Sequence, residues 1–268
     1  MVRGIYTAAS GLLTAERDIN VRSNNIANLN TAGFKQDRLV ATTFAEAVAV
    51  RQETRTTGKT YDIGQSTRGK KALEIKTDFS QGALQATERR LDFAISGDGF
   101  FTIQSYKGEY DPDTNPNGIY GGKYYTRNGQ FQINPDGYLI NGLGDFVLDD
   151  SDQPILVERY DFTVDEAGNI TAADGTSIAK LGIYNPDDAG LLIKSGEEAF
   201  TVLNADNEPA PQDFTGTIRQ GYVERANTDL ASQMAGLIAS SRSFQSMTQI
   251  IKAIDNEVGK SISDVARV

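Results

Sequence analysis

The chain has 268 residues, enough for one large domain or two smaller ones, and contains neither cysteine nor histidine. Their absence excludes disulfides, thiolate or histidine metal sites and any catalytic arrangement that needs a histidine base. The formal net charge of −10 argues against a nucleic-acid partner, because phosphate binding needs clustered Lys and Arg. Residues 1–43 carry five Lys/Arg and three Asp/Glu, and residues 221–268 carry five of each, so the acidic excess lies between them.

The first thirty residues carry a heptad pattern. Apolar residues recur every seven positions, at Ile5, Leu12, Ile19 and Ile26. Ala8, Ala15 and Leu29 lie three residues after three of them. The pattern predicts an amphipathic helix. We expect it to end in the stretch 28–33, since Asn and Gly tolerate the left-handed conformation of a helix C-cap.

A stronger heptad pattern occupies the last forty residues. Steps of four and three lead through Leu230, Met234, Leu237, Ser241, Phe244, Thr248, Ile251, Asp255, Val258, Ile262 and Val265, with Ile238, Met247 and Ile254 widening the stripe. Asn227, Thr228 and Asp229 supply N-cap chemistry before it. The predicted helix of about 38 residues would be about 57 Å long. Neither terminal helix could bury its apolar seam alone, but the two together, or with copies of themselves, could.

Between the helices the pattern changes to that of an all-β domain. Asn-Gly or Asp-Gly pairs at 98–99, 128–129, 136–137, 141–142 and 174–175 separate short apolar runs. The predicted strands are Leu91–Ile95, Phe100–Gln104, Gln130–Ile133, Phe146–Leu148, Phe162–Val164 and Ile178–Tyr184. This spacing is typical of antiparallel hairpins. Residues 45–84 are polar and predict an extended connector with a strand around Ala72–Ile75.

Two patterns could carry chemistry, and both favour a plainer interpretation. Asp111–Gly118 resembles a calcium loop, but Pro116 and Gly122 stand where such a loop needs Gly and a bidentate Glu. Acid pairs at 149–150 and 197–198 could serve carboxylate hydrolysis, but such pairs are common solubilising features. We therefore expect no enzyme activity, no cofactor and no metal. No stretch approaches the roughly 20 apolar residues of a membrane span, and no signal peptide is visible.

Several segments resemble the axial proteins of the bacterial flagellum, the rod and hook subunits. Residues 24–35, NNIANLNTAGFK, match eight positions of the N-terminal signature Asn-Asn-x-Ala-Asn-x-x-Thr-x-Gly-Phe/Tyr-Lys. Gly97–Phe101 and Tyr125–Gly129 resemble central motifs of the longer members, and Gly221–Glu224 resembles the C-terminal block. Residues 5–11 and 238–244 look closer to the proximal FlgF type of rod protein, whereas the long 45–84 connector suits the distal FlgG type.

The resemblance implies an α+β fold in which long N- and C-terminal helices pack as a coiled coil beside a mainly antiparallel all-β central domain. The expected parts are residues 1–38 (helix and Asn-rich turn), 39–84 (connector), 85–220 (β domain) and 221–268 (C-terminal helix). It implies a structural subunit of the basal-body rod in the cell envelope, which polymerises helically into a drive shaft and export channel. Expected partners are copies of itself, neighbouring rod and hook subunits, and the flagellar type III export apparatus.

The resemblance also assigns an assembly interface to the two seams and the Asn-rich turn. The expected interface residues are Ile5, Leu12, Ile19, Asn24, Asn25, Ile26, Asn28, Leu29, Thr31, Gly33, Phe34, Leu230, Met234, Leu237, Ile238, Phe244, Ile251, Val258 and Ile262. Phe34 is also a candidate anchor under the β domain. The alternative function is a secreted all-β binding or carboxylate-based hydrolytic domain with helical oligomerisation tails.

Overall fold

The computed structural model describes residues 2–43, 47–52, 60–66, 70–106, 120–157, 161–196, 198–202 and 213–265. The chain divides into two compact units. The first contains residues 1–27, 37–76 and 229–268, and the second contains residues 28–36 and 77–228. Each unit therefore combines segments that lie far apart in the sequence. The Asp111–Gly118 loop considered for calcium falls outside the described residues.

The ends of the chain form two long helices, α1 (Val2–Ala27) and α2 (Leu230–Val265). Both helices were predicted from the heptad patterns, and this prediction is confirmed. α1 ends directly before Asn28, where the Asn-rich stretch begins. At the start of α2, the Asp229 carboxylate accepts a hydrogen bond of 2.9 Å from the backbone N–H of Ser232 and caps the helix.

Four strands complete the first unit. They are β1 (Asp37–Thr43), β2 (Ala47–Gln52), β3 (Thr60–Ser66) and β4 (Lys70–Thr77). β1 pairs with β4, and β2 pairs with β3 as an antiparallel hairpin. The expected strand around Ala72–Ile75 lies within β4, but the sequence did not predict β2 and β3. Their residues are mostly Thr, Gln, Arg and small side chains, which lack the strong alternation of apolar and polar positions that marks a half-buried strand.

The second unit is built of short strands. These are β5 (Leu84–Ala86), β6 (Phe93–Ser96), β7 (Phe100–Tyr106), β8 (Tyr120–Thr126), β9 (Gln132–Ile133), β10 (Leu139–Ile140), β11 (Phe146–Val147), β12 (Phe162–Val164), β13 (Asn169–Ala172), β14 (Ser177–Lys180), β15 (Ile183–Tyr184), β16 (Leu192–Ser195), β17 (Ala199–Val202), β18 (Thr217–Gln220) and β19 (Tyr222–Glu224). A short 3-10 helix, Ala189–Leu191, precedes β16. Every described strand pair of this unit with a defined register is antiparallel, so the predicted mainly antiparallel β region is confirmed.

The largest sheet of this unit has the strand order β16-β17-β8-β7-β11-β10-β9, and β15 also pairs with β7. A second sheet has the order β12-β13-β14, and β18 with β6 and β19 with β5 form two-stranded ladders. The predicted strand Ile178–Tyr184 is two strands instead of one. It breaks at Leu181 and Gly182 because their N–H groups donate to the carbonyl groups of Gly168 and Leu148 respectively.

Large aromatic side chains fill the core of the second unit. Phe93, Phe101, Phe131 and Leu139 are fully buried, and the Phe101 and Phe131 rings meet edge to face with centroids 5.3 Å apart. Such pairs stabilise a core beyond the area they bury. A second buried cluster contains Phe100, Tyr125, Tyr184, Leu192 and Phe200. This unit therefore carries its own hydrophobic core.

Candidate functional site

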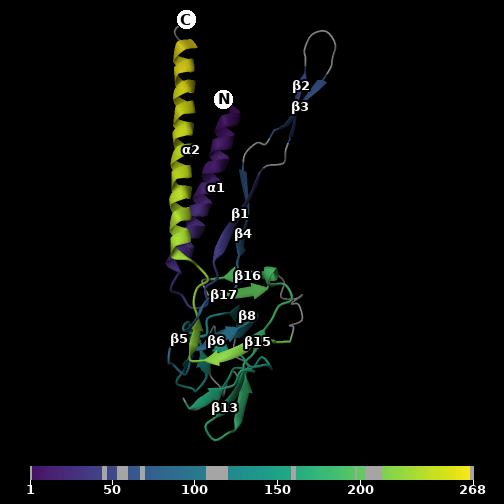
Figure 1. Ribbon diagram of the computed structural model, residues 1–268, viewed down its shortest axis with the longest axis vertical. Coiled ribbons are helices and arrows are strands. Elements are labelled where there is room, and N and C mark those ends of the chain that lie inside the picture. Colours follow the sequence, from purple (N-terminus) through teal and green to yellow (C-terminus); the bar gives the residue numbers. More distant parts are fainter. Residues whose placement is uncertain are drawn as a thin grey trace. The chain divides into compact units, whose positions relative to one another are not determined.

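The helices α1 and α2 lie side by side and antiparallel in the first unit (Figure 1). Contacts between small and large residues define their register. Gly4 lies opposite Ile254, where a Cβ on the glycine would be 3.5 Å from Cδ1 of the isoleucine. Gly11 lies against the thioether of Met247, and Gly236 against the guanidinium of Arg22, each so closely that a Cβ would overlap the partner.

Polar contacts continue the same register. The Ser240 hydroxyl donates a hydrogen bond to the Asp18 carboxylate, which also pairs with Arg22 at 2.8 Å. One helical heptad further along α1, the Asn25 amide nitrogen lies 3.5 Å from Oε1 of Gln233. The alignment is antiparallel and constant along the pair: position 4 faces 254, 11 faces 247, 18 faces 240, 22 faces 236 and 25 faces 233.

On α1 the facing positions lie one residue before the large residues of the predicted seam. Gly4 and Gly11 make the contacts, whereas Ile5 and Leu12 follow them in the chain. On α2 the facing positions include two large residues, Met247 and Ile254, which pack against these glycines. Small residues on one helix allow the two backbones to approach closely. The large apolar series of α1 therefore borders the contact line, whereas Met247 and Ile254 of α2 lie on it.

The expected interface residues have different environments. Ile5, Asn24, Leu230, Met234, Ile238 and Ile262 are exposed; Leu12, Ile19, Ile26, Leu29, Thr31, Leu237, Phe244, Ile251 and Val258 are half-buried; and Asn25, Asn28, Gly33 and Phe34 are buried. Met234, Ile238 and Ile262 are 50%, 49% and 64% exposed. Large apolar side chains thus remain open to solvent on helices that have already paired within one chain.

Asn25 connects the last turn of α1 to the first strand. Its side-chain amide nitrogen donates to the carbonyl of Asp37 (2.8 Å), and its Oδ1 accepts from the N–H of Asp37 (2.9 Å). The side chain is 1% exposed. One asparagine thereby satisfies both backbone groups of the first residue of β1, a task that needs a donor and an acceptor on one short side chain.

The Asn-rich stretch after α1 is a compact turn in the second unit. The Asn28 carbonyl and its Oδ1 accept hydrogen bonds from the N–H and the hydroxyl of Thr31, each at 3.2 Å. Gly33 has φ +70°, and a Cβ there would overlap the backbone of Arg127 and Asn128. Only glycine fits both conditions. The Gly33 N–H donates to the Glu224 carbonyl at 2.7 Å, which brings the N-terminal and C-terminal motifs together.

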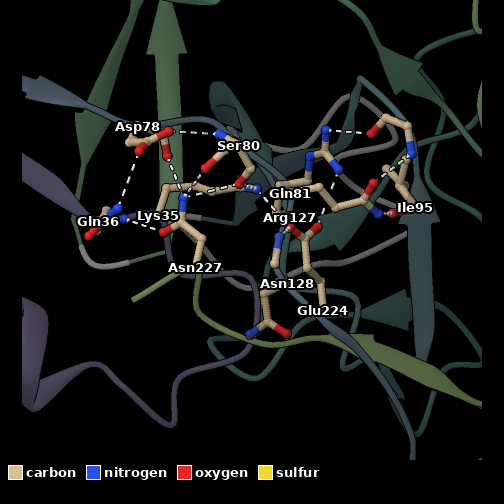
Figure 2. A network of polar contacts seen from close by, with 12 residues as sticks. Lys35, Gln36, Asp78, Ser80, Gln81, Ile95, Arg127, Asn128, Glu224 and Asn227 are labelled. Carbon is tan, nitrogen blue, oxygen red and sulfur yellow. Dashed lines mark hydrogen bonds and ion pairs between the residues drawn. The ribbon is translucent and has the colours of Figure 1, made fainter. Parts of the chain in front are cut away.

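A buried ion cluster lies directly after this turn (Figure 2). The Lys35 ammonium donates to Oε1 of Glu224 (2.7 Å) and to the carbonyl of Ser80 (2.8 Å). Arg127 donates to Oε2 of Glu224 (3.2 Å) and to the carbonyl of Gly97 (2.8 Å). The Lys35, Arg127 and Glu224 side chains are at most 3% exposed. One carboxylate therefore holds two buried cations that come from separate motifs.

Burial lowers the pKa of Lys35 and that of Arg127 below their ordinary values, because desolvation disfavours the charged forms, while Glu224 opposes the shift in both. The Lys194 ammonium covers the buried Phe34 ring at 4.0 Å from its centroid and donates to the Lys35 carbonyl. Phe34 is 1% exposed, so it is anchored inside the β unit.

Asn227 extends the cluster to the segment before α2 (Figure 2). Its Oδ1 accepts from the N–H of Gln36 (2.8 Å), and its amide nitrogen donates to the carbonyls of Asp78 (2.8 Å) and Ser80 (3.0 Å). Gln36, Asp78 and Asn227 each lie within two residues of a point where the chain leaves the second unit for the first. The cluster thus joins three segments, residues 33–36, 78–82 and 224–227.

The sequence did not predict this cluster, although Lys35, Arg127 and Glu224 all lie in the motifs that carried the resemblance. Lys35 and Glu224 are 189 residues apart, so no local pattern links them. The sequence offered one signal: Lys35 ends the motif 24–35, Glu224 ends the motif 221–224, and Arg127 lies within the motif 125–129.

The carboxylates considered for hydrolysis have structural contacts. Oδ1 of Asp149 accepts from the N–H groups of Ser151 and Gln153, both at 2.8 Å, and caps a turn. The Glu198 carboxylate accepts from the amide of Asn128 at 2.6 Å. Glu197 lies outside the described residues. Within the part of the chain that the structure describes, no group of three acidic residues could hold a metal ion, and no helix is long and apolar enough to cross a membrane.

Comparison with known proteins gives matches along most of the chain. The model of the flagella basal body rod protein matches residues 5–35, that of the flagellar hook protein FlgE/F/G D1 domain matches residues 94–172, and that of the flagellar basal body rod FlgEFG protein C-terminal matches residues 219–263. These three matches contain the helix seams, Lys35, Arg127 and Glu224.

Full-length relatives agree with these matches. The flagellar basal-body rod protein FlgF of Caulobacter vibrioides is 31% identical, with 100% of this chain and 98% of the relative aligned. FlgG of Bacillus subtilis is 30% identical over 95% of this chain and 96% of its own length. The hook-basal body complex protein FlhO of B. subtilis is 27% identical over the full length of both. The chain belongs to the rod and hook family of flagellar basal-body proteins.

Proposed function

We propose that this chain is a non-enzymatic subunit that polymerises helically through its terminal helices and forms part of the rod drive shaft and its export channel. The observation that carries the proposal is the exposure of large apolar side chains on α1 and α2 after the helices have paired with each other. Exposed apolar patches of this kind mark interaction surfaces. The partners are other copies of this chain and neighbouring rod and hook subunits, and export proceeds through the flagellar type III apparatus.

The buried ion cluster supports a mechanical role. A shaft subunit must pass force from its polymerising helices to the rest of the chain, and that force crosses the backbone near residues 28, 36, 77 and 228. The contacts of Lys35, Glu224 and Asn227 hold these segments to one another inside the second unit. Buried ion pairs resist separation because breaking one leaves an uncompensated charge. Torque would therefore pass through packing and fixed hydrogen bonds and not through chemistry.

Electron microscopy of basal bodies from a deletion strain tests the proposal. We expect the rod to stop early, and expression of the intact chain to restore it. Because residues 5–11 and 238–244 look closer to the FlgF type, we place the subunit in the proximal rod, and the remaining stub should lack part of the proximal rod as well as the whole distal rod. A full-length rod in the deletion strain would contradict a structural role, and a truncation confined to the distal end would move the subunit to the distal position.

A further inference from the structure

The register of the helix pair separates two sides of it. An α-helix turns 100° per residue, so residues that follow the contact positions point to one side and residues that precede them point to the other. α1 and α2 run in opposite directions, so their chains wind in opposite senses when the pair is viewed from one end. The residues that follow the contact positions therefore lie on the same side of the pair in both helices. The alignment is the same from the Gly4–Ile254 contact to the Asn25–Gln233 contact, so the two sides stay distinct along the pair.

The two sides differ in composition. If the alignment is extended by heptads to positions 243 and 250, the residues that follow contact positions include Ile5, Leu12, Ile19 and Ile26 on α1, and Met234, Leu237, Phe244 and Ile251 on α2, with Ser241, Thr248 and Asp255 between them; we call this the apolar side. The residues that precede contact positions include Ser10, Arg17 and Asn24 on α1, and Ser232, Ala235, Arg242 and Gln249 on α2; we call this the polar side. Smaller or polar residues such as Ala9 and Glu16 lie between the large members of the apolar side.

α2 extends beyond the residues that α1 can cover. Since Gly4 faces Ile254, Val2 at the start of α1 would face residue 256. α2 continues to Val265, about 14 Å further at 1.5 Å per residue. Its heptad continues there with Val258 and Ile262, and Ile262 is 64% exposed. No described α1 residue lies opposite this extension, so its exposed Ile262 is available to a helix of another molecule.

We propose that the apolar side of the helix pair binds a second copy of this chain, and that the polar side faces water in the polymer. The inference rests on the proposed function and adds which side makes the contact. A second copy fits because its apolar side repeats the same heptad spacing. The near-neutral ends of the chain would also bring two such sides together without net repulsion, as residues 221–268 carry equal numbers of acidic and basic residues.

Single cysteines test the assignment cleanly, because the chain has none of its own. Ser10 and Leu12 flank the contact residue Gly11, both half-buried, and Ser232 and Met234 flank Gln233, both exposed. Leu12→Cys and Met234→Cys therefore report on the apolar side. Ser10→Cys and Ser232→Cys are the matched variants on the polar side. Each variant is labelled with a small maleimide as the purified monomer, and again in basal bodies isolated from a complemented deletion strain.

We expect labelling at Leu12→Cys and Met234→Cys to slow by about tenfold or more on assembly, and labelling at Ser10→Cys and Ser232→Cys to stay unchanged. Exclusion of both apolar-side variants from basal bodies that accept the polar-side variants would support the same assignment. Protection of the polar side with continued labelling of the apolar side would overturn it and leave the proposed function standing. Absence of the unmutated chain from basal bodies would overturn both.

Discussion

The two units of the molecule bury their large side chains to very different extents. In the β unit, Phe93, Phe101 and Phe131 are completely buried. In the helical unit, glycines of one helix pack against Ile254, Met247 and Arg22 of the other, and Tyr6 and Leu13 are 71% and 58% exposed. The β unit thus buries an aromatic core within one chain, whereas the helical unit leaves large apolar residues exposed on paired helices. Stability and assembly should therefore respond to mutations in different units.

The largest effect should come from a charge on the apolar side of the helix pair. We expect Leu237→Asp to abolish motility and rod growth. Burying a leucine contributes about 1.5–3 kcal/mol per contact, and an unpaired charge in an apolar interface costs more than the lost contact. The thermal unfolding of the β unit in the secreted subunit should not change.

Ala235→Asp is the matched control, because Ala235 and Leu237 flank Gly236 on opposite sides of the same helix and Ala235 is exposed. Cells that carry Ala235→Asp should swim. If this variant is immotile and the Leu237→Asp strain swims, the difference between the two sides has been assigned the wrong way round.

A smaller but still large effect should follow from removing the charge at the centre of the ion cluster. Glu224→Gln removes the carboxylate that pairs directly with the buried Lys35 and Arg127. Breaking a buried pair in this way destabilises a protein by about 3–5 kcal/mol. Denaturant unfolding of the full chain should show this loss in the transition of the β unit.

Glu198→Gln provides the control, since Glu198 is half-buried and contacts one amide, that of Asn128. The loss there should be about 1 kcal/mol or less. Equal losses for the two variants would show that the cluster contributes no more than an ordinary hydrogen bond.

A moderate effect is expected at the junction of α1 and β1. Asn25→Ala removes the two side-chain hydrogen bonds to the backbone N–H and carbonyl of Asp37, which costs about 1–3 kcal/mol. Asn24→Ala changes the same residue type at the exposed neighbouring position and should have a smaller effect. Amide hydrogen exchange at Asp37 measures the difference: exchange should accelerate in Asn25→Ala, and unchanged exchange would contradict the role of this side chain.

The smallest effect concerns a turn on the surface of the β unit. The side-chain amide and then the backbone N–H of Asn169 hydrogen-bond the Asp165 carboxylate and lower its pKa below 3.8. A lowered pKa means that the folded state favours the ionised carboxylate, so its contribution to stability is present above pH 3.8 and is lost as the pH falls through the lowered value. An NMR titration of Asp165 should have its midpoint below 3.8, and Asn169→Ala should move it upward. A midpoint at or above 3.8 in the unmutated chain would exclude the effect.

Local patterns in the sequence determined the secondary structure and the family. The heptads predicted α1 and α2, and Asn28 and Asp229 correctly marked where one ends and the other begins, because capping depends on neighbouring residues alone. The apolar runs between turn residues predicted β6, β7, β9, β11 and β12, and β14 with β15 as a single strand. They did not predict β5, β8, β10, β13, β16, β17, β18 and β19, nor the β2–β3 hairpin, whose residues include few large apolar side chains.

Only the tertiary structure revealed the alignment of the helices and the ion cluster. A heptad stripe covers a broad sector of a helix, so periodicity alone does not show whether Gly11 or Leu12 faces α2. The point where the two helix backbones come closest decides which of them does. Lys35, Arg127 and Glu224 come from three distant segments, and their pairing depends on Gly33 bringing the turn against the backbone of Arg127. Sequence determined which residues could form each element, and packing determined which residues meet, because a contact between distant segments has no local signal.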